Sequence, residues 1–502
     1  MSRLATPQET VERALAASRA DGCAVLVEEL SQAEVRFANN TTTTNGVRRD
    51  RRVAVVSFRL VSGSGPAATA VGAGPTAVGV ASASGAVDVE NLVRASEAEA
   101  ALAEPAEDAA PLVTPGEGSR SGDASPGGAG SRPGEAGGAG SRPGEARGAG
   151  FDDGPALTGA SVLSGVVSGL AEAFGRARST GDLLSGFATH GVASTYLGTS
   201  TGLRRLHVQP AGTFELVARS ADGARSVWSG AGTASFDDVD VHAFEEQVRR
   251  RLAWARHQIE LPAGRYEVLL PPDATADLMV ALSEAMSGRD AEEGRSPFSA
   301  MGGGTRIGER LCELPFGLRG DPAEPGLESA PFLVTAASGT DVSVFDNGLP
   351  VGATNWIEGG HLRRLRYHRA GAGRAGVPAS PPVGNLVLGL PGADATLDEM
   401  VAGTERGLLL TCLWYIREVD PVTLLLTGLT RDGVYLVEHG EVVGAVNNFR
   451  FNESPLDVLA RTVEAGRTER ALSREWGEWM NRTAMPALRV ADFNMSSVSP
   501  AT

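Results

Sequence analysis

The chain has 502 residues and a formal net charge of −16, and all 45 of its basic Lys+Arg positions are arginine, because no lysine occurs in the sequence. Schiff-base chemistry, pyridoxal phosphate attachment and the phosphate-binding P-loop each need a lysine amine, so all three are excluded. The acidic balance argues against direct binding of nucleic acid, because phosphate contacts require concentrated positive charge.

The length predicts more than one domain. No apolar run approaches the length of a membrane span, and the first residues, MSRLATPQETVER, lack the apolar core of a signal peptide, so we expect a cytoplasmic protein without membrane contact. Cys23, Cys312 and Cys412 are isolated from one another in the sequence. This pattern indicates buried thiols in a reducing compartment rather than a disulfide framework.

The first predicted unit, residues 1–103, combines helices with strand hairpins. A helix is expected over residues 6–20, with Thr6 as its N-cap and Pro7 at its first position. A second helix is expected to begin near Asp88 and to end near residue 103. Strand-like apolar runs lie between these helices, at residues 23–30, 33–40 and 51–61 and in a Gly/Ala-rich stretch that ends near residue 84.

The composition changes over residues 104–156. The unit GGAGSRPGEA occurs twice in succession, and Gly, Pro, Ser, Ala and Glu dominate the segment. Such a composition offers little apolar surface to offset the entropy of ordering. We therefore expect a disordered insert between the first unit and the next.

Residues 157–262 are expected to form a central α+β unit that completes the N-terminal domain. A helical pattern runs to about residue 178, and strand-like runs follow at residues 185–198, 203–210, 214–220 and 224–230. A further helix is predicted over residues 239–260. Its apolar stripe consists of Val241, Phe244, Val248, Leu252 and Ala255.

Residues 263–502 are expected to form a β-rich, barrel-like C-terminal domain with peripheral helices, which makes the fold class α+β. A buried strand at residues 265–273 leads into a helix, for which Asp273 is the predicted N-cap and Gly288 the predicted C-terminal stop. Strands then dominate to about residue 451. The domain is expected to end with a helix at residues 454–465 and a strand at residues 486–497.

Several stretches together resemble the TldD/TldE (PmbA) family. They are VRFANN with the Thr-rich loop after it, STYLGTSTGLRR, YEVLLPPDATADLMVALSEAMSGRDAEEGRSPFS, SVFDNGLPVGATNWIEGGHLRRLRYHRAGA, and the run from NLVLGLPG to VEHGE. The resemblance covers nearly the whole chain except the insert. It implies a cytoplasmic metallopeptidase system that trims unfolded peptides and, in some members, matures modified peptides.

That family contains two kinds of subunit. The TldD kind resembles a zinc peptidase, with His-Glu-x-x-x-His on a helix and a cysteine near the C-terminus as third ligand, and the TldE kind lacks these ligands and pairs with it. Here the matching positions are Ser283, Glu284 and Gly288, and no cysteine follows Cys412. A hydroxyl group and a hydrogen atom cannot replace two imidazoles as zinc ligands. We therefore expect no catalytic residue and no metal ligand in this chain, with zinc in the partner subunit.

The resemblance thus favours a non-catalytic TldE/PmbA-like subunit that pairs with a TldD-like subunit and helps to form the chamber for unfolded or modified peptides. Glu284 is expected to be an ordinary polar helix residue or to contact a peptide. The sequence leaves two other functions open. One is a regulatory protein of the gyrase-modulator type. The other is a stand-alone hydrolase whose nucleophile is Ser200, in a G-x-S-x-G pattern that also suits a hairpin turn, or Cys412 assisted by His439.

One basic stretch, HLRRLRYHR at residues 361–369, is predicted to be a strand. Its arginines could bind a peptide carboxylate through paired hydrogen bonds, or they could form a solvated charged edge.

Overall fold

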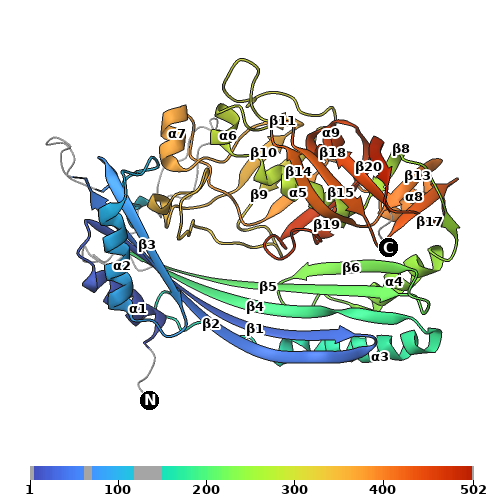
Figure 1. Cartoon of the computed structure of the whole chain (residues 1–502), viewed down its shortest axis with the longest axis horizontal. Helices are drawn as coiled ribbons and strands as arrows, with labels where there is room; N and C mark the ends of the chain where they lie inside the picture. The colour runs from blue at the N-terminus through green and yellow to red at the C-terminus, as the bar shows by residue number, and fades with distance from the viewer. Residues whose placement is uncertain (1–4, 62–70, 118–149, 500–502) are drawn as a thin grey trace, which may run out of the picture.

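The computed structural model describes residues 5–61, 71–117 and 150–499. It contains two units, which lie one above the other in Figure 1. The N-terminal unit is a six-stranded sheet with helices α1 to α4, and the C-terminal unit is a system of fourteen strands with helices α5 to α9. The predicted α+β fold class is confirmed.

The sheet of the N-terminal unit has the strand order β3-β2-β1-β4-β5-β6, and each neighbouring pair is antiparallel. Its central pair, β1 and β4, joins strands from either side of the 104–156 segment. Two pairs of predicted runs merge, so that β1 and β5 are each one long strand. The strands are β1 (Gly22–Ala38), β2 (Thr41–Leu60), β3 (Thr76–Ser84), β4 (Leu183–Thr199), β5 (Arg204–Arg219) and β6 (Ser226–Thr233).

The Thr-rich stretch that was expected to be a loop is the first half of β2. It follows a tight turn at Asn39 and Asn40, whose φ angles are 51° and 60°, as the primed hairpin turns require. The Asn40 side chain fixes this turn, because it donates to the Asp182 carbonyl and accepts from the Leu184 amide. Because of this turn, β2 pairs with β1 from Thr41 onward, although the side chains of its first half are exposed and contribute no core burial.

Helices cover one face of this sheet. Figure 1 shows α1 and α2 at one end of the long strands and α3 at the other. Thr6 caps α1 in a capping box with Glu9, and Asp88 caps α2, both at the predicted positions. The helices are α1 (Pro7–Ala17), α2 (Val89–Leu102), the 3-10 turn η2 (Ala160–Leu163), α3 (Ser164–Thr180) and α4 (Val241–Trp254).

The expected disorder of residues 104–156 is wrong for the two ends of that segment. Leu112 and Val113 are buried on one side, and Phe151 is buried on the other, where its ring lies 5.9 Å from that of Tyr196. Burial of these apolar side chains favours order at both ends of the segment. The composition of residues 104–156, taken as a whole, did not reveal them. The repeat itself lies outside the described residues.

The C-terminal unit surrounds helix α5 with strands of mixed direction. Its core includes Phe298, Phe316, Phe449 and Phe493. The strands are β7 (Gln258–Ile259), β8 (Gly264–Leu270), β9 (Gly317–Gly320), β10 (Thr354–Glu358), β11 (His361–Leu362), β12 (Leu386–Gly389), β13 (Arg406–Leu410), β14 (Leu413–Asp420), β15 (Leu425–Thr430), β16 (Val434–Glu438), β17 (Glu441–Val446), β18 (Phe449–Glu453), β19 (Thr462–Ala471) and β20 (Thr483–Val498).

Strand β20 holds this unit together, because it pairs with β8, β12, β18 and β19. The helices are shorter than expected. The one predicted at residues 454–465 ends early, since β19 begins at Thr462. They are α5 (Pro272–Glu284), α6 (Gly288–Glu292), the 3-10 turn η3 (Val344–Asp346), α7 (Arg369–Ala375), α8 (Leu397–Ala402) and α9 (Pro455–Ala460).

The two units are in direct contact. At one end, Phe58 of the sheet packs on Phe345, with 4.8 Å between ring centroids. At the other, the guanidinium of Arg474 lies between Trp228 of β6 and Trp414 of β14, at 5.2 and 4.7 Å from their ring centroids. Across the residues described, no helix is both long and apolar enough to pass through a bilayer.

Candidate functional site

The three positions matched to a metal helix lie on two helices, with Ser283 and Glu284 at the end of α5 and Gly288 at the start of α6. Ser283 lies in the last turn of α5, and its hydroxyl donates to the Val280 carbonyl at 2.8 Å. Glu284 ends this helix and is exposed. Arg366 donates to both its carboxylate and its carbonyl oxygen, at 3.1 and 2.6 Å.

Gly288 was predicted to end helix α5. That prediction is wrong, because Gly288 is the first residue of α6. Ser287 caps α6 by accepting a hydrogen bond from the Asp290 amide. A Cβ atom on Gly288 would lie 2.0 Å from Cζ of Tyr367, so the tyrosine ring fills the space that a side chain would need. Ser283 and Gly288 are therefore on separate helices, and position 288 is closed to histidine. Within the described ranges, no three His, Cys, Asp or Glu side chains are grouped so that they could hold a metal ion.

Ser200 lies in the turn between the antiparallel strands β4 and β5. Its amide and its hydroxyl both bond to the backbone of Cys23, and the following strand begins at Arg204. A nucleophile elbow needs a helix after the serine. The hairpin interpretation of this motif is confirmed.

Cys412 is 1% exposed, and Arg474 lies against its sulfur. Burial raises the pKa of this thiol to about 12, which leaves it protonated and unreactive at neutral pH. His439 is 81% exposed on the turn between β16 and β17 and pairs with Glu405. The structure does not bring this cysteine and this histidine together as a catalytic pair.

The basic stretch at residues 361–369 is a strand only at His361–Leu362, so its prediction as one long strand is wrong. His368 is buried and caps α7 by accepting a hydrogen bond from the Gly371 amide. Two of the arginines are held by this chain's own carboxylates: Arg366 pairs with Asp341 at 2.6 Å, and Arg369 pairs with the buried Asp346 at 2.7 Å. These two guanidinium groups are not free to dock a peptide.

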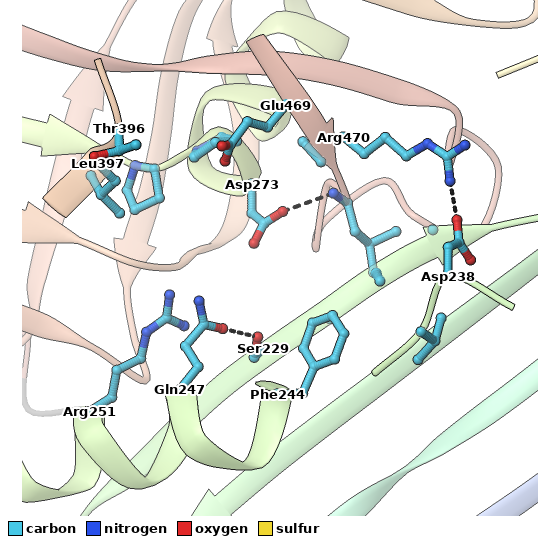
Figure 2. A pocket seen from close by; sticks show the side chains of 18 of the residues that line it. Ser229, Asp238, Phe244, Gln247, Arg251, Asp273, Thr396, Leu397, Glu469 and Arg470 are labelled. Atoms are coloured by element: carbon cyan, nitrogen blue, oxygen red, sulfur yellow. Dashed lines mark hydrogen bonds and ion pairs between the residues drawn. The ribbon is translucent and has the colours of Figure 1, made fainter. Parts of the chain in front are cut away.

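A cavity of about 520 Å³ lies where the two units meet, and we call it the interunit cavity. Helix α4 and strand β6 form one wall, while the start of α5, the end of β19 and the start of α8 form the other. Figure 2 shows Arg251 and Gln247 rising from α4 toward Asp273 and Glu469. Phe244 and Leu397 add apolar surface.

Most charged groups around the interunit cavity have partners. Asp238 pairs with Arg470, and Arg250 pairs with Asp398 at 3.3 Å. Each of these two ion pairs joins a residue of the N-terminal unit to one of the C-terminal unit. Arg467 pairs with Glu469 within the C-terminal wall.

Arg251 differs from these arginines. It is 4% exposed, and its Nη1 donates to the Trp228 carbonyl at 2.6 Å. No carboxylate among the described residues lies within ion-pair distance of it. Burial lowers its pKa, since the charged form loses hydration. This guanidinium therefore retains unused donors at the cavity wall.

Asp273, on the opposite wall, was predicted to be the N-cap of its helix. That prediction is wrong, because α5 begins at Pro272 and Asp273 instead reaches a distant segment, where its carboxylate accepts from the Leu472 amide at 2.9 Å. Burial raises the pKa of Asp273 to about 6. One turn later, the buried Asp277 accepts from the Ser473 hydroxyl and the Glu475 amide, and burial raises its pKa to about 8.

The sequence did not predict that Arg251 and Asp273 line a common cavity. One feature of the sequence indicated that Arg251 is unusual. Arg251 lies between Val248 and Leu252 on the apolar stripe of its helix, and a charged residue inside such a stripe indicates a special environment. No comparable signal exists for Asp273, because its partner, the backbone amide of Leu472, is 199 residues away in the sequence.

Comparison with known proteins places this geometry in context. Residues 263–497 match the family described as PmbA/TldA metallopeptidase C-terminal domain. Curated protein sequences give no match.

Solved structures share the fold over nearly the full length. TldE from Thermococcus kodakarensis has 14% identity and a TM-score of 0.71, and the alignment covers 98% of this chain and 99% of that one. A putative modulator of a DNA gyrase from Thermotoga maritima has 16% identity and a TM-score of 0.70, with coverage of 97% and 100%. A putative modulator of DNA gyrase from Bacteroides thetaiotaomicron has 14% identity and a TM-score of 0.69, with coverage of 98% of each chain. Residues 263–497 thus form a domain of the PmbA/TldA metallopeptidase C-terminal family, and the whole chain has the fold of TldE and of the two gyrase-modulator structures.

Proposed function

We propose that this chain is a non-catalytic, TldE/PmbA-like subunit, which pairs with a TldD-like zinc peptidase in the cytoplasm and helps to admit unfolded or modified peptides to the partner's metal. The observation that carries the proposal is the packing at Gly288. The ring of Tyr367 fills the space beside Gly288, the position that the resemblance matches to the second histidine, and a break between helices α5 and α6 separates this position from Ser283. The family's catalytic chemistry thus falls to the partner.

The thiol and hydroxyl alternatives have little support. Cys412 is enclosed beside Arg474, and Ser200 is a turn residue bonded to the backbone of Cys23. A peptide-admitting role is compatible with the long edge of β2 over residues 41–50, where the backbone can pair with an extended chain irrespective of its sequence.

Reconstitution tests the proposal. The full chain is purified alone, together with a TldD-like protein that retains both histidines, and as a mixture of the two. We expect the chain alone to hold less than stoichiometric zinc and to leave an unfolded peptide intact, and we expect the mixture to form one complex that cleaves it. Stoichiometric zinc together with peptidase activity in this chain alone would overturn the proposal.

A matched variant sharpens the test. Ser283→His combined with Gly288→His restores the imidazoles of the motif but not the helix that must present them. We expect no zinc in this variant, measured by elemental analysis, because Tyr367 blocks position 288. Zinc uptake by the double variant would show that the two positions do converge on a metal.

A regulatory role is the second candidate, and its support is the description of two structural neighbours as putative modulators of DNA gyrase. The net charge of −16 favours action through a protein contact rather than through DNA. A salt-sensitive shift of DNA by the purified chain would contradict that view.

A further inference from the structure

The interunit cavity holds two opposite charges, Arg251 and Asp273, which attract each other electrostatically but form no ion pair. Arg251 lies on its α4 wall and Asp273 on its α5 wall, as Figure 2 shows. The described part of the chain offers Arg251 a single carbonyl, that of Trp228, and offers the Asp273 carboxylate the Leu472 amide. Both residues thus face the same space with unused hydrogen-bonding capacity.

This arrangement is costly for a purely structural site. A buried guanidinium loses its hydration, and only a paired anion with good geometry compensates for that loss. The neighbouring charges at this cavity show that the chain can provide such pairs, as in Asp238–Arg470 and Arg250–Asp398.

We propose that the interunit cavity binds a short peptide with free termini, whose terminal carboxylate bonds to Arg251 and whose terminal ammonium faces Asp273. A guanidinium suits a carboxylate because its parallel N–H groups match the two carboxylate oxygens. The volume of about 520 Å³ lies within the range of small-molecule sites. Phe244 and Leu397 offer apolar surface to the side chains of the peptide.

This inference goes beyond the proposed function, because the site lies entirely within this chain and requires neither a partner subunit nor a metal. The two can therefore fail separately: the chain could bind short peptides without ever joining a peptidase, or join one while this cavity stays unused.

Calorimetric titration of the full chain tests the site with four probes: alanyl-alanine, its C-terminal amide, its N-acetyl derivative, and free alanine. We expect saturable binding of alanyl-alanine. Amidation removes the anion and N-acetylation removes the cation, so each should weaken binding by about tenfold or more, which is the scale of one charge-assisted hydrogen bond. Free alanine tests whether the cavity is instead a site for single amino acids. Binding of free alanine as tight as that of alanyl-alanine would contradict the proposal.

Two variants assign the ends of the ligand. Arg251→Gln should bind the dipeptide and its amide equally weakly, whereas Asp273→Asn should bind the dipeptide and its N-acetyl derivative alike. Arg13→Gln, which removes an exposed ion pair with Glu90 on α1, serves as the control and should bind as the wild type does. A merely structural role would change stability without erasing these probe preferences.

Asp273→Asn is isosteric, so it keeps the test valid if Arg251→Gln fails to fold. The proposal is overturned if no probe binds saturably to the wild type, or if folded Asp273→Asn retains the full preference for the free ammonium. It is also overturned if folded Arg251→Gln retains the preference for the free carboxylate.

Discussion

Two arginines with little exposed surface, Arg474 and Arg251, lie where the N-terminal and C-terminal units meet, and their surroundings differ in kind. Arg474 is packed between Trp228 and Trp414 and donates to Asp432 at 2.7 Å and to Cys412 at 2.6 Å. Arg251 has the carbonyl of Trp228, with an open cavity beyond it. The same side-chain type thus joins the two units at one place and is left for a ligand at the other. Burial alone does not distinguish these roles, whereas the list of partners does.

Removal of Arg474 should have the largest effect on stability. Arg474→Met breaks the 2.7 Å pair of the buried Asp432 and leaves this carboxylate only the longer pair with Arg431 at 3.6 Å. Breaking a buried pair costs up to about 3–5 kcal/mol. We expect a large loss in the urea midpoint of unfolding, accompanied by a change in tryptophan fluorescence. Arg48→Gln is the control, because Arg48 and its partner Asp50 are 66% and 56% exposed, so the change should alter stability by less than about 1 kcal/mol. Equal losses in the two variants would contradict the role assigned to Arg474.

The corresponding substitution at the interunit cavity, Arg251→Met, should have a much smaller effect on stability. Arg251→Met removes one hydrogen bond, worth about 1 kcal/mol, but also removes an uncompensated buried charge. We expect the urea midpoint to stay within about 1 kcal/mol of the wild type or to rise. A loss comparable with that of Arg474→Met would show that Arg251 is structural after all.

The buried carboxyl group of Asp277 predicts that the stability of the fold depends on pH. Burial raises the pKa of Asp277 to about 8, from the ordinary aspartate value of 3.8. A carboxyl whose folded pKa is raised favours folding fully below its unfolded pKa, and it loses that contribution as pH rises through the folded value. We therefore expect stability to fall between about pH 4 and pH 8.

Asp277→Asn isolates this effect, since its amide oxygen can still accept from the Ser473 hydroxyl and the Glu475 amide. The variant should show a flatter profile of unfolding midpoint against pH than the wild type. Asp398→Asn, at a side chain that is 69% exposed, should leave the profile unchanged. Parallel profiles for the wild type and Asp277→Asn would refute the assignment.

The smallest expected effect concerns the thiol beside Arg474. The pKa of Cys412 is raised to about 12 by burial and that of Cys23 to about 11, and Cys312 is buried as well. We expect no thiol to react with a disulfide reagent in the native protein at neutral pH, and all three to react in denaturant. Rapid labelling of native Cys412 would show that the contact between the two units opens readily.

Local patterns predicted local structure well. Thr6 and Asp88 cap the helices expected of them, and the pattern around Ser200 is the hairpin turn. Errors arose where a distant contact decided the outcome. Gly288 was assigned to a helix end from its residue type, but Tyr367 packs on it and a new helix begins there.

The candidate site was less accessible to sequence reasoning than the fold. The family resemblance pointed to Ser283, Glu284 and Gly288, which the structure places on two helices instead of one. Arg251 and Asp273 converge because α4 and α5 belong to different units that pack together, and no short-range pattern records such packing. Only the position of Arg251 on an apolar stripe gave a hint.

The central place of β20 has a consequence for synthesis on the ribosome. The N-terminal unit has the sixth strand of its sheet by Thr233 and α4 by Trp254, so it can close while the rest of the chain is still being translated. The C-terminal unit, in contrast, lacks the strand that pairs with β8, β12, β18 and β19 until Thr483–Val498 emerges. A message cut short near its end should therefore yield a finished first half attached to an open second half, which cellular proteases would remove.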